Sequence, residues 1–368
     1  MDNTDVIAVI GLGLIGSSIA RSIKNKIGTA YIIGIDKNAD YIRAALEDGV
    51  ISSGHVMDNF DVHILSTADI VFICTPLRII ETIVSNIIPY LKAGCIITDT
   101  ASVKSPIIQA IKPLINEKIS FIGGHPMAGT EQSGYYAGNS HMLENAYYVL
   151  TPIDSASGAL NKLSSIITAI GAKPIVMDAE MHDNVVAAIS HMPHVLASTL
   201  LQYISKHPHA EYMKMLAAGA FRDMTRIASS DPQMWRDICL ANANAVKQSL
   251  NGLIDVLMQF NEILDKKDEI AITRYFATAK ECRESISAFK PSYSQSTFDI
   301  IADVEDRPGI IGEIASLIGQ HGLNIKNIAI LNSREGLPGA LKISFQDEST
   351  SKKALEILRN TGFKVYTD

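Results

Sequence analysis

The sequence has few cysteines, a single tryptophan and no excess of positive charge. Its four cysteines, Cys74, Cys95, Cys239 and Cys282, lie far apart, and the first two fall in strand-like apolar runs. This spacing argues against a disulfide framework and against a cysteine-based metal site, so we expect no metal. The net charge of −7 at pH 7 argues against nucleic acid as the main partner.

The sequence also lacks a targeting segment and a long apolar run. A strand is expected at 6–10, which leaves no room for a signal peptide, and no apolar run approaches the roughly 18 residues of a membrane span. With 368 residues, of which 47% are hydrophobic, the chain is long enough for two or three domains. We therefore expect a soluble, cytoplasmic protein that has no membrane partner.

Strand and helix patterns divide the chain into parts. Strand candidates alternate with helical patterns up to residue 178, at 6–10, 31–36, 69–75, 95–99, 120–123, 147–151 and 174–177. This alternation predicts an α/β domain of Rossmann type over 1–178, with a parallel sheet covered on both faces. The helical patterns at 184–204, 233–264 and 269–287 predict an all-helical domain over 179–289, and its long apolar helices favour dimerisation. A linker at 290–296 and a ferredoxin-like βαββαβ domain over 297–368 follow.

A glycine fingerprint opens the first domain. Gly11, Gly13 and Gly16 follow the first strand, and Leu14 and Ile15 lie between the last two, before a helix expected at 17–24. The glycines permit a tight turn, close approach of a pyrophosphate and close helix packing. Asp36 ends the second strand twenty residues after Gly16, where a carboxylate accepts both ribose hydroxyls and repels a 2′-phosphate. We therefore predict NAD rather than NADP. A glycine turn in another kind of α/β protein is the alternative, and Lys37 favours some tolerance of NADP.

Several polar residues are expected at the same sheet edge. Thr75 is a candidate neighbour of the nicotinamide ribose, and Pro76 ends its strand where the cofactor would lie. Ser102 is either a helix N-cap or part of an active site. The segment 123–131, Gly-Gly-His-Pro-Met-Ala-Gly-Thr-Glu, predicts a glycine-lined loop that carries His125 and Glu131. These groups together predict a small-molecule site at the carboxyl ends of the strands.

Three segments resemble the prephenate dehydrogenase family: residues 123–131, Ser-His-Met-Pro-His at 190–194, and Asp-Met-Thr-Arg-Ile-Ala-Ser-Ser-Asp-Pro-Gln-Met-Trp at 223–235. The resemblance implies NAD-dependent oxidative decarboxylation of prephenate to 4-hydroxyphenylpyruvate, in tyrosine biosynthesis, by a homodimer. Arogenate dehydrogenases share the pattern and remain an alternative, as does another dehydrogenase on the same scaffold. A catalytically inactive NAD-binding amino-acid sensor is a third alternative, which the joint presence of Ser102, His125, His194 and Arg226 disfavours.

The resemblance also implies site residues. His125 matches the catalytic histidine, a neutral imidazole that accepts a hydrogen bond from the substrate hydroxyl, and Ser102 matches a serine of the same pocket. His194 and Arg226 match substrate-binding residues, since a guanidinium binds a carboxylate bidentately. We also assign Thr130, Glu131 and Gly219 to the substrate site, and Glu131 is placed to pair with an arginine and close the entrance. A metal site at His191 and His194 is disfavoured, because no third ligand accompanies them.

The last domain resembles the ACT domain, a regulatory amino-acid-binding module. Residues 303–315 place a proline–glycine turn between a strand and a helix, and backbone N–H groups at a helix N-terminus suit a ligand carboxylate. We therefore predict that L-tyrosine binds here as an effector. A structural or dimer-forming domain is the alternative. A hairpin is expected at 332–339, and the residues assigned to regulation are Asp306, Pro308, Gly309, Ile310, Ile311 and Gly312.

Overall fold

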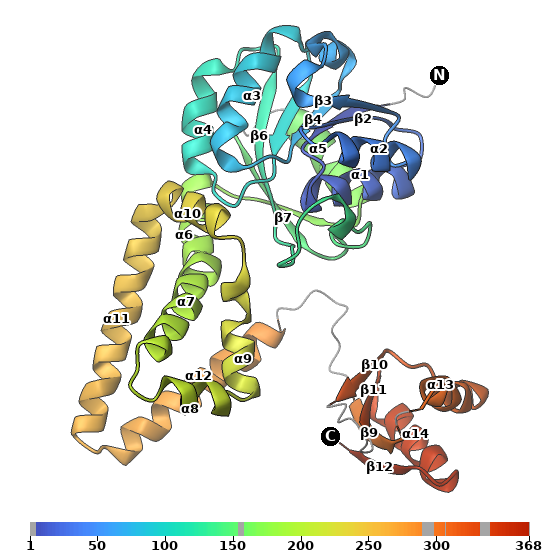
Figure 1. The fold of residues 1–368 in the computed structure, drawn as a ribbon, viewed down its shortest axis with the longest axis vertical. Coiled ribbons are helices and arrows are strands. Elements are labelled where there is room, and N and C mark those ends of the chain that lie inside the picture. Colours follow the sequence, from blue (N-terminus) through green and yellow to red (C-terminus); the bar gives the residue numbers. More distant parts are fainter. Residues whose placement is uncertain (1–4, 154–157, 289–297, 306, 332–338, 368) are drawn as a thin grey trace. The chain divides into compact units, whose positions relative to one another are not determined.

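The computed structural model describes residues 5–153, 158–288, 298–305, 307–331 and 339–367. It divides into two compact units, Met1–Lys266 and Lys267–Asp368 (Figure 1). Each unit has its own sheet.

The described residues of the first unit form an eight-stranded sheet in the order β3-β2-β1-β4-β5-β6-β7-β8. The sheet is mixed, because β7 runs antiparallel to β6 while the other strand pairs are parallel. The prediction of a parallel sheet was therefore wrong at this one pair. The strands are β1 (Val6–Ile10), β2 (Tyr31–Asp36), β3 (Ser53–Val56), β4 (Ile70–Ile73), β5 (Ile96–Asp99), β6 (Ser120–Pro126), β7 (Tyr147–Pro152) and β8 (Lys173–Val176).

Helices cover both faces of this sheet. One buried apolar cluster packs α1 (Leu14–Lys26), α2 (Ala39–Glu47) and α5 (Gly158–Ala169) on one face, and a second packs α3 (Ile80–Ile87) and α4 (Ser105–Ile111) on the other. Figure 1 shows the two groups on opposite sides. Burial on both faces explains why β1 and β4 are continuous apolar runs. Strand β3, Ser-Gly-His-Val, lies at the sheet edge and has no such run, so the sequence did not predict it.

Strand β6 continues through His125 to Pro126. Its partner β7 supplies an antiparallel ladder in which His125 lies opposite Val149. The expectation of a glycine-lined loop beginning at Gly123 was therefore wrong for its first residues, since pairing with β7 holds the two glycines and His125 extended. The imidazole consequently projects from a sheet rather than from a loop.

A helical part completes the first unit. Helix α6 (Ala179–Val186) runs through a π-helical turn at Ala187–His191 into α7 (Met192–Ser205). Pro193 has no N–H for the carbonyl one turn earlier, and a wider turn at this point accommodates that loss. The remaining helices are α8 (Ala210–Leu216), α9 (Gly219–Thr225), α10 (Pro232–Ala241) and α11 (Ala243–Asp265). The single helix expected at 233–264 is instead broken at Asn242.

By length and composition, the helical run Ala179–Ser205 is apolar enough to cross a membrane. The expectation that no apolar run approaches that length therefore does not hold for this segment. The run carries His182 and Asp183, both buried, and their side chains make hydrogen bonds with His125 and Lys104 of the sheet domain. These contacts attach the helix to the sheet domain of the same unit.

The second unit contains a βαββαβ domain, as predicted, and α12 (Glu269–Ala288), which was expected in the helical domain. Its antiparallel sheet has the order β10-β11-β9-β12, and α13 and α14 bury Ile314 and Leu358 in the same core as Ile300 and Phe345. The elements are β9 (Phe298–Val304), α13 (Ile310–Gln320), β10 (Asn327–Leu331), β11 (Gly339–Phe345), α14 (Glu348–Asn360) and β12 (Lys364–Thr367). Asp306, the linker 290–296 and residues 332–338 of the expected hairpin lie outside the described residues.

Candidate active site

The glycine turn after β1 has the shape that a dinucleotide requires. Gly11 has a φ of +94°, and a Cβ on Gly16 would lie 1.8 Å from the carbonyl oxygen of Gly11, so both positions require glycine. A Cβ on Gly13 would meet nothing within 4 Å, which leaves room for a ligand there. Helix α1 begins at Leu14, three residues earlier than expected, and the N–H groups of its first turn have no acceptor within the helix.

Asp36 and Thr75 border this turn. The buried Asp36 carboxylate accepts hydrogen bonds from the N–H of Leu12 at 2.6 Å and of Asn38 at 2.8 Å. The Thr75 Oγ1 is buried and has no partner among the described residues, while its methyl group lies 3.1 Å from where a Cβ of Gly11 would be. Pro76 follows and is exposed. A bound dinucleotide fits these surroundings. It would give the Thr75 hydroxyl a partner, occupy the space beside Gly13 and lie next to the Asp36 carboxylate.

A buried ion pair holds the loop that carries Ser102. The Lys104 ammonium, fully buried, donates to the Asp99 carboxylate and to the carbonyl oxygen of Gly124. Burial lowers the pKa of Lys104, and the Asp99 charge opposes that shift. Asp99 also accepts from the N–H of Gly124 and of Ala101. Lys104 is the N-cap of α4, so the alternative that Ser102 is only an N-cap is wrong.

Three side chains, those of Asp183, His182 and His125, form a hydrogen-bonded row that ends at His125. Its Nδ1 lies 2.8 Å from Nε2 of His182, and Nδ1 of His182 lies 2.8 Å from the Asp183 carboxylate. Burial, followed by the His182 and Lys104 charges, lowers the pKa of His125 well below its ordinary value. Burial raises the pKa of Asp183, but hydrogen bonds from His182 and from the N–H groups of Lys104 and Ser105 outweigh it and leave that pKa below its usual value.

Asn242 joins this row to the other histidines. Its side-chain amide donates to the Asp183 carbonyl at 2.8 Å and lies 3.2 Å from Nδ1 of His191. Burial lowers the pKa of His191 to about 4. The Trp235 ring stacks on His194 with centroids 3.8 Å apart, and burial lowers the pKa of His194. His191 Nε2 and Trp235 Nε1 are buried without partners among the described residues, so two N–H groups are left for a ligand.

Arg226 and Glu131 form an ion pair. The guanidinium is in the short helix Arg226–Ser229, and the carboxylate follows β6. The pairing of Glu131 with an arginine was expected from the sequence, and closure of the entrance stays a prediction. Arg236 pairs with Asp237, as the sequence suggested, and Asp237 also binds Arg78, from the loop after β4, at 2.7 Å.

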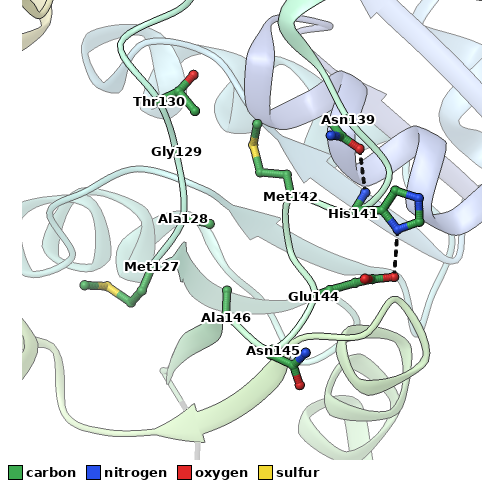
Figure 2. Close-up of a pocket in the computed structure, with 10 residues that line it drawn as sticks. All are labelled: Met127, Ala128, Gly129, Thr130, Asn139, His141, Met142, Glu144, Asn145 and Ala146. Carbon is green, nitrogen blue, oxygen red and sulfur yellow. Dashed lines mark hydrogen bonds and ion pairs between the residues drawn. The ribbon is translucent and has the colours of Figure 1, made fainter. Parts of the chain in front are cut away.

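Thr130 and Gly219 are both exposed. Thr130 lines an open depression beyond β6, together with Met127, Ala128, Gly129 and residues 139–146 except Ser140 and Leu143 (Figure 2). Figure 2 also shows His141 bonded to Glu144 at 3.0 Å there. His125 does not line this depression. The depression therefore lies beside the row of histidines rather than over it.

Sequence reasoning missed four residues of this site: Asp99, Lys104, His182 and Asp183. Asp99 and Lys104 flank Ser102, and an apolar strand that ends in aspartate shortly before a lysine was the available signal. His182 and Asp183 carry no local pattern, because His182 contacts His125 across 57 residues of sequence and Asp183 joins the site through His182.

Comparison with known proteins agrees with this arrangement along the chain. Residues 19–176 match the model of the prephenate dehydrogenase nucleotide-binding domain, residues 178–278 match the prephenate dehydrogenase dimerization domain, and residues 298–363 match the ACT domain. The chain belongs to the prephenate dehydrogenase family. It is 35% identical over 357 residues to the prephenate dehydrogenase of Bacillus subtilis, covering 95% of this chain and 94% of that protein.

Two solved structures of the family share the first two domains. A prephenate dehydrogenase from A. aeolicus in complex with hydroxyphenyl propionate and NAD+ is 29% identical, with a TM-score of 0.71 over 77% of this chain and 99% of its own. An arogenate dehydrogenase from Synechocystis is 29% identical, with a TM-score of 0.68 over 76% of this chain and 99% of its own.

Proposed function

We propose that the protein is a cytoplasmic, NAD-dependent prephenate dehydrogenase that makes 4-hydroxyphenylpyruvate. The proposal is carried by the imidazole of His125, whose pKa is lowered by burial. The same family member has a dinucleotide turn and a guanidinium, Arg226, that pairs with Glu131, six residues after His125. A neutral imidazole is what a hydroxyl requires as its proton acceptor. The four cysteines are all unpaired, which fits a reducing compartment.

The cofactor would rest on residues of the first βα unit. The N–H groups at the start of α1, around Gly13, Leu14 and Ile15, would bind the pyrophosphate, and Asp36 would accept hydrogen bonds from the ribose hydroxyls. Thr75 and Pro76 would border the nicotinamide end. When bound, NAD supplies the acceptor for the hydride that leaves the substrate ring.

Residues of the chain would then accept the proton of the ring hydroxyl and bind the substrate carboxylates. His125 accepts the hydrogen bond of the ring hydroxyl and holds its proton as the carbonyl forms, which stabilises the positive charge that develops at this carbon. Carbon dioxide leaves, the ring becomes aromatic, and the proton returns to the phenolic oxygen. Ser102 bonds the same hydroxyl, while Arg226 exchanges Glu131 for a substrate carboxylate and His194 and Gly219 complete the pocket.

Steady-state assays with both substrates and both cofactors test the proposal. Prephenate with NAD should give the highest kcat/KM, with NADH and carbon dioxide formed in equal amounts. Arogenate dehydrogenase is the second candidate, because the Synechocystis arogenate dehydrogenase is nearly as similar to this chain as the A. aeolicus prephenate dehydrogenase is. A higher kcat/KM with arogenate would favour it, and no turnover of either substrate would contradict both.

Removing the guanidinium should weaken substrate binding. Arg226→Ala should raise the KM for prephenate by roughly tenfold or more, the scale of a lost charged hydrogen bond of about 1.5–3 kcal/mol. Arg222→Ala is the matched control, since Arg222 is an exposed arginine on the preceding helix α9. Initial rates over a range of prephenate concentrations measure both. The opposite order of effects would show that another residue holds the carboxylate.

Removing the carboxylate at the end of β2 should relax cofactor choice. Asp36→Ser should weaken NAD and raise the ratio of NADP to NAD turnover, because the repulsion of a 2′-phosphate is lost. The variant also loses an acceptor for the N–H of Leu12, so its thermal unfolding should be compared with that of wild type. An unchanged cofactor ratio would contradict contact between Asp36 and the ribose.

We further propose a homodimer formed through the helical domain. The match to a dimerization domain at 178–278 supports this, as do large apolar side chains that remain exposed on its helices. They include Ile189, Tyr203, Leu216 and Leu240, each 62–72% exposed. Domains at 1–178, 179–289 and 297–368, with a linker at 290–296, are the organisation we propose.

We also propose that the ACT domain binds L-tyrosine. Gly309, with a φ of +89°, is the N-cap of α13 and has no side-chain cap; Gly312 lies in the first turn, where Ile310 is buried and Ile311 is 39% exposed. This leaves backbone N–H groups for a carboxylate next to Pro308. Asp306, assigned with them, lies outside the described residues.

Deletion of residues 293–368 tests this regulation. Non-competitive inhibition by tyrosine, a coupling of about 1–3 kcal/mol, should disappear while turnover persists, since the relatives without this tail keep the fold of the first two domains. Competitive inhibition by 4-hydroxyphenylpyruvate is the control and should remain. Equal sensitivity to tyrosine in both forms would contradict sensing by the ACT domain.

A further inference from the structure

The row that ends at His125 begins at backbone N–H groups. The Asp183 carboxylate accepts hydrogen bonds from the N–H of Lys104 and from the N–H of Ser105, both at 2.8 Å. It also lies 2.8 Å from Nδ1 of His182, whose Nε2 lies 2.8 Å from Nδ1 of His125. The two rings are nearly perpendicular, at 78°. His182 and Asp183 are buried, so water does not replace these partners.

Hydrogen bonding in this row determines where the protons lie. A carboxylate only accepts, so the proton between Asp183 and His182 is on Nδ1 of His182. When His182 is neutral, its proton on Nδ1 leaves Nε2 bare, and a bare Nε2 accepts a hydrogen bond. Nδ1 of His125 must therefore carry its proton, and Nε2 of His125 is left bare.

The bare nitrogen is the one available to a ligand. Nε2 of His125 has no hydrogen-bond partner among the residues that the structure describes, and the ring is half-buried rather than sealed. A bare Nε2 accepts a hydrogen bond from a hydroxyl, whereas the other tautomer would present an N–H donor to it. The tautomer of His125 therefore decides whether the ring can take a proton.

We propose that His182 and Asp183 are positioning residues that fix His125 in its Nδ1–H tautomer, so that Nε2 receives the proton of the substrate hydroxyl. The role of Nε2 in turnover rests on the proposed function, while the tautomer itself does not. The Asp183 carboxylate is fixed in this orientation, because each of its oxygens accepts a hydrogen bond from a backbone N–H at the start of α4. The same bonds hold the segment just after Ser102, so Asp183 orients the histidine and the serine together.

Nitrogen-15 NMR of histidine-labelled protein at pH 8 tests the tautomer directly. Long-range proton–nitrogen correlations should show a protonated Nδ1 and a bare Nε2 for His125, whose signals are identified by their loss in His125→Asn. A protonated Nε2 on His125 in the wild-type protein would overturn the proposal. This measurement needs no substituted His182, so it decides the matter even where a variant fails to fold.

Two substitutions at His182 then test the consequence. His182→Leu removes the acceptor, and His182→Gln offers a carbonyl oxygen near the position of Nε2. The leucine variant should lose at least about tenfold in kcat, less than removal of the proton acceptor itself would cost, with the KM for prephenate and the Kd for NAD near wild type. The glutamine variant should fall between the two. A leucine variant that keeps wild-type kcat, or equal losses in both variants, would count against positioning.

A failure of the proposed function would be recognised separately. Wild-type protein that oxidises neither prephenate nor arogenate with NAD would contradict the dehydrogenase. The NMR result on His125 would still support or overturn the hydrogen-bonded row, since it requires no substrate.

Discussion

The variant His125→Asn should bind NAD as the wild type does and lose roughly two to four orders of magnitude in kcat, the usual contribution of a positioned proton acceptor. Asparagine cannot take the proton of the hydroxyl, although its amide can still form one hydrogen bond. Calorimetric titration with NAD and steady-state assays with prephenate measure the two quantities. The matched control is His63→Asn, at an exposed histidine of the same unit, and a kcat within about threefold of wild type at His125 would contradict the assignment.

The pH dependence of the wild type gives a second view of the same residue. Burial lowers the pKa of His125, so the ring stays neutral, and able to accept a proton, as the pH falls below the ordinary value of about 6.5. Activity is lost only when the pH falls through the lowered pKa. The acid limb of kcat should therefore lie below pH 6.5, and a midpoint above it would show that the buried surroundings do not persist in the complex with substrate.

Lys104→Met should cause the largest loss of stability, about 3–5 kcal/mol, the cost of breaking a buried ion pair by removing one partner. The substitution leaves the Asp99 carboxylate, fully buried in the structure, with only backbone N–H donors. Trp235, the single tryptophan, lies in the first unit, so its fluorescence during denaturation in urea reports the unfolding of that unit.

The control for this stability effect is Lys118→Met, at an exposed lysine of the same unit, which should change the unfolding free energy by no more than about 0.5 kcal/mol. The double variant Asp99→Leu/Lys104→Met should recover part of the loss, because no unpaired charge remains. If Lys104→Met behaves like Lys118→Met, the pair contributes no net stability.

Much of the fold was predictable because its signals are local. The apolar runs of β1 and β2, the glycines at 11, 13 and 16, and the turn at Pro308 and Gly309 each determine nearby backbone geometry through residues that are neighbours in sequence. These signals predicted the Rossmann-type sheet, the dinucleotide turn and the βαββαβ domain. The segments at 123–131, 190–194 and 223–235 predicted the family, because residue identity within a short stretch suffices for that.

Other features depend on contacts between distant segments, and only the tertiary structure decided them. Whether Gly123 to Pro126 is loop or strand depends on β7, whose antiparallel partner residues lie 22 to 28 positions further along the chain. The contact between His125 and His182 joins residues 57 positions apart, and the pairing of Glu131 with Arg226 joins residues 95 positions apart. The sequence alone determined which residue types are present for the chemistry. Packing of the helical part against the sheet decided which of them touch, because a hydrogen bond or an ion pair depends on distance in space and leaves no periodic pattern along the chain.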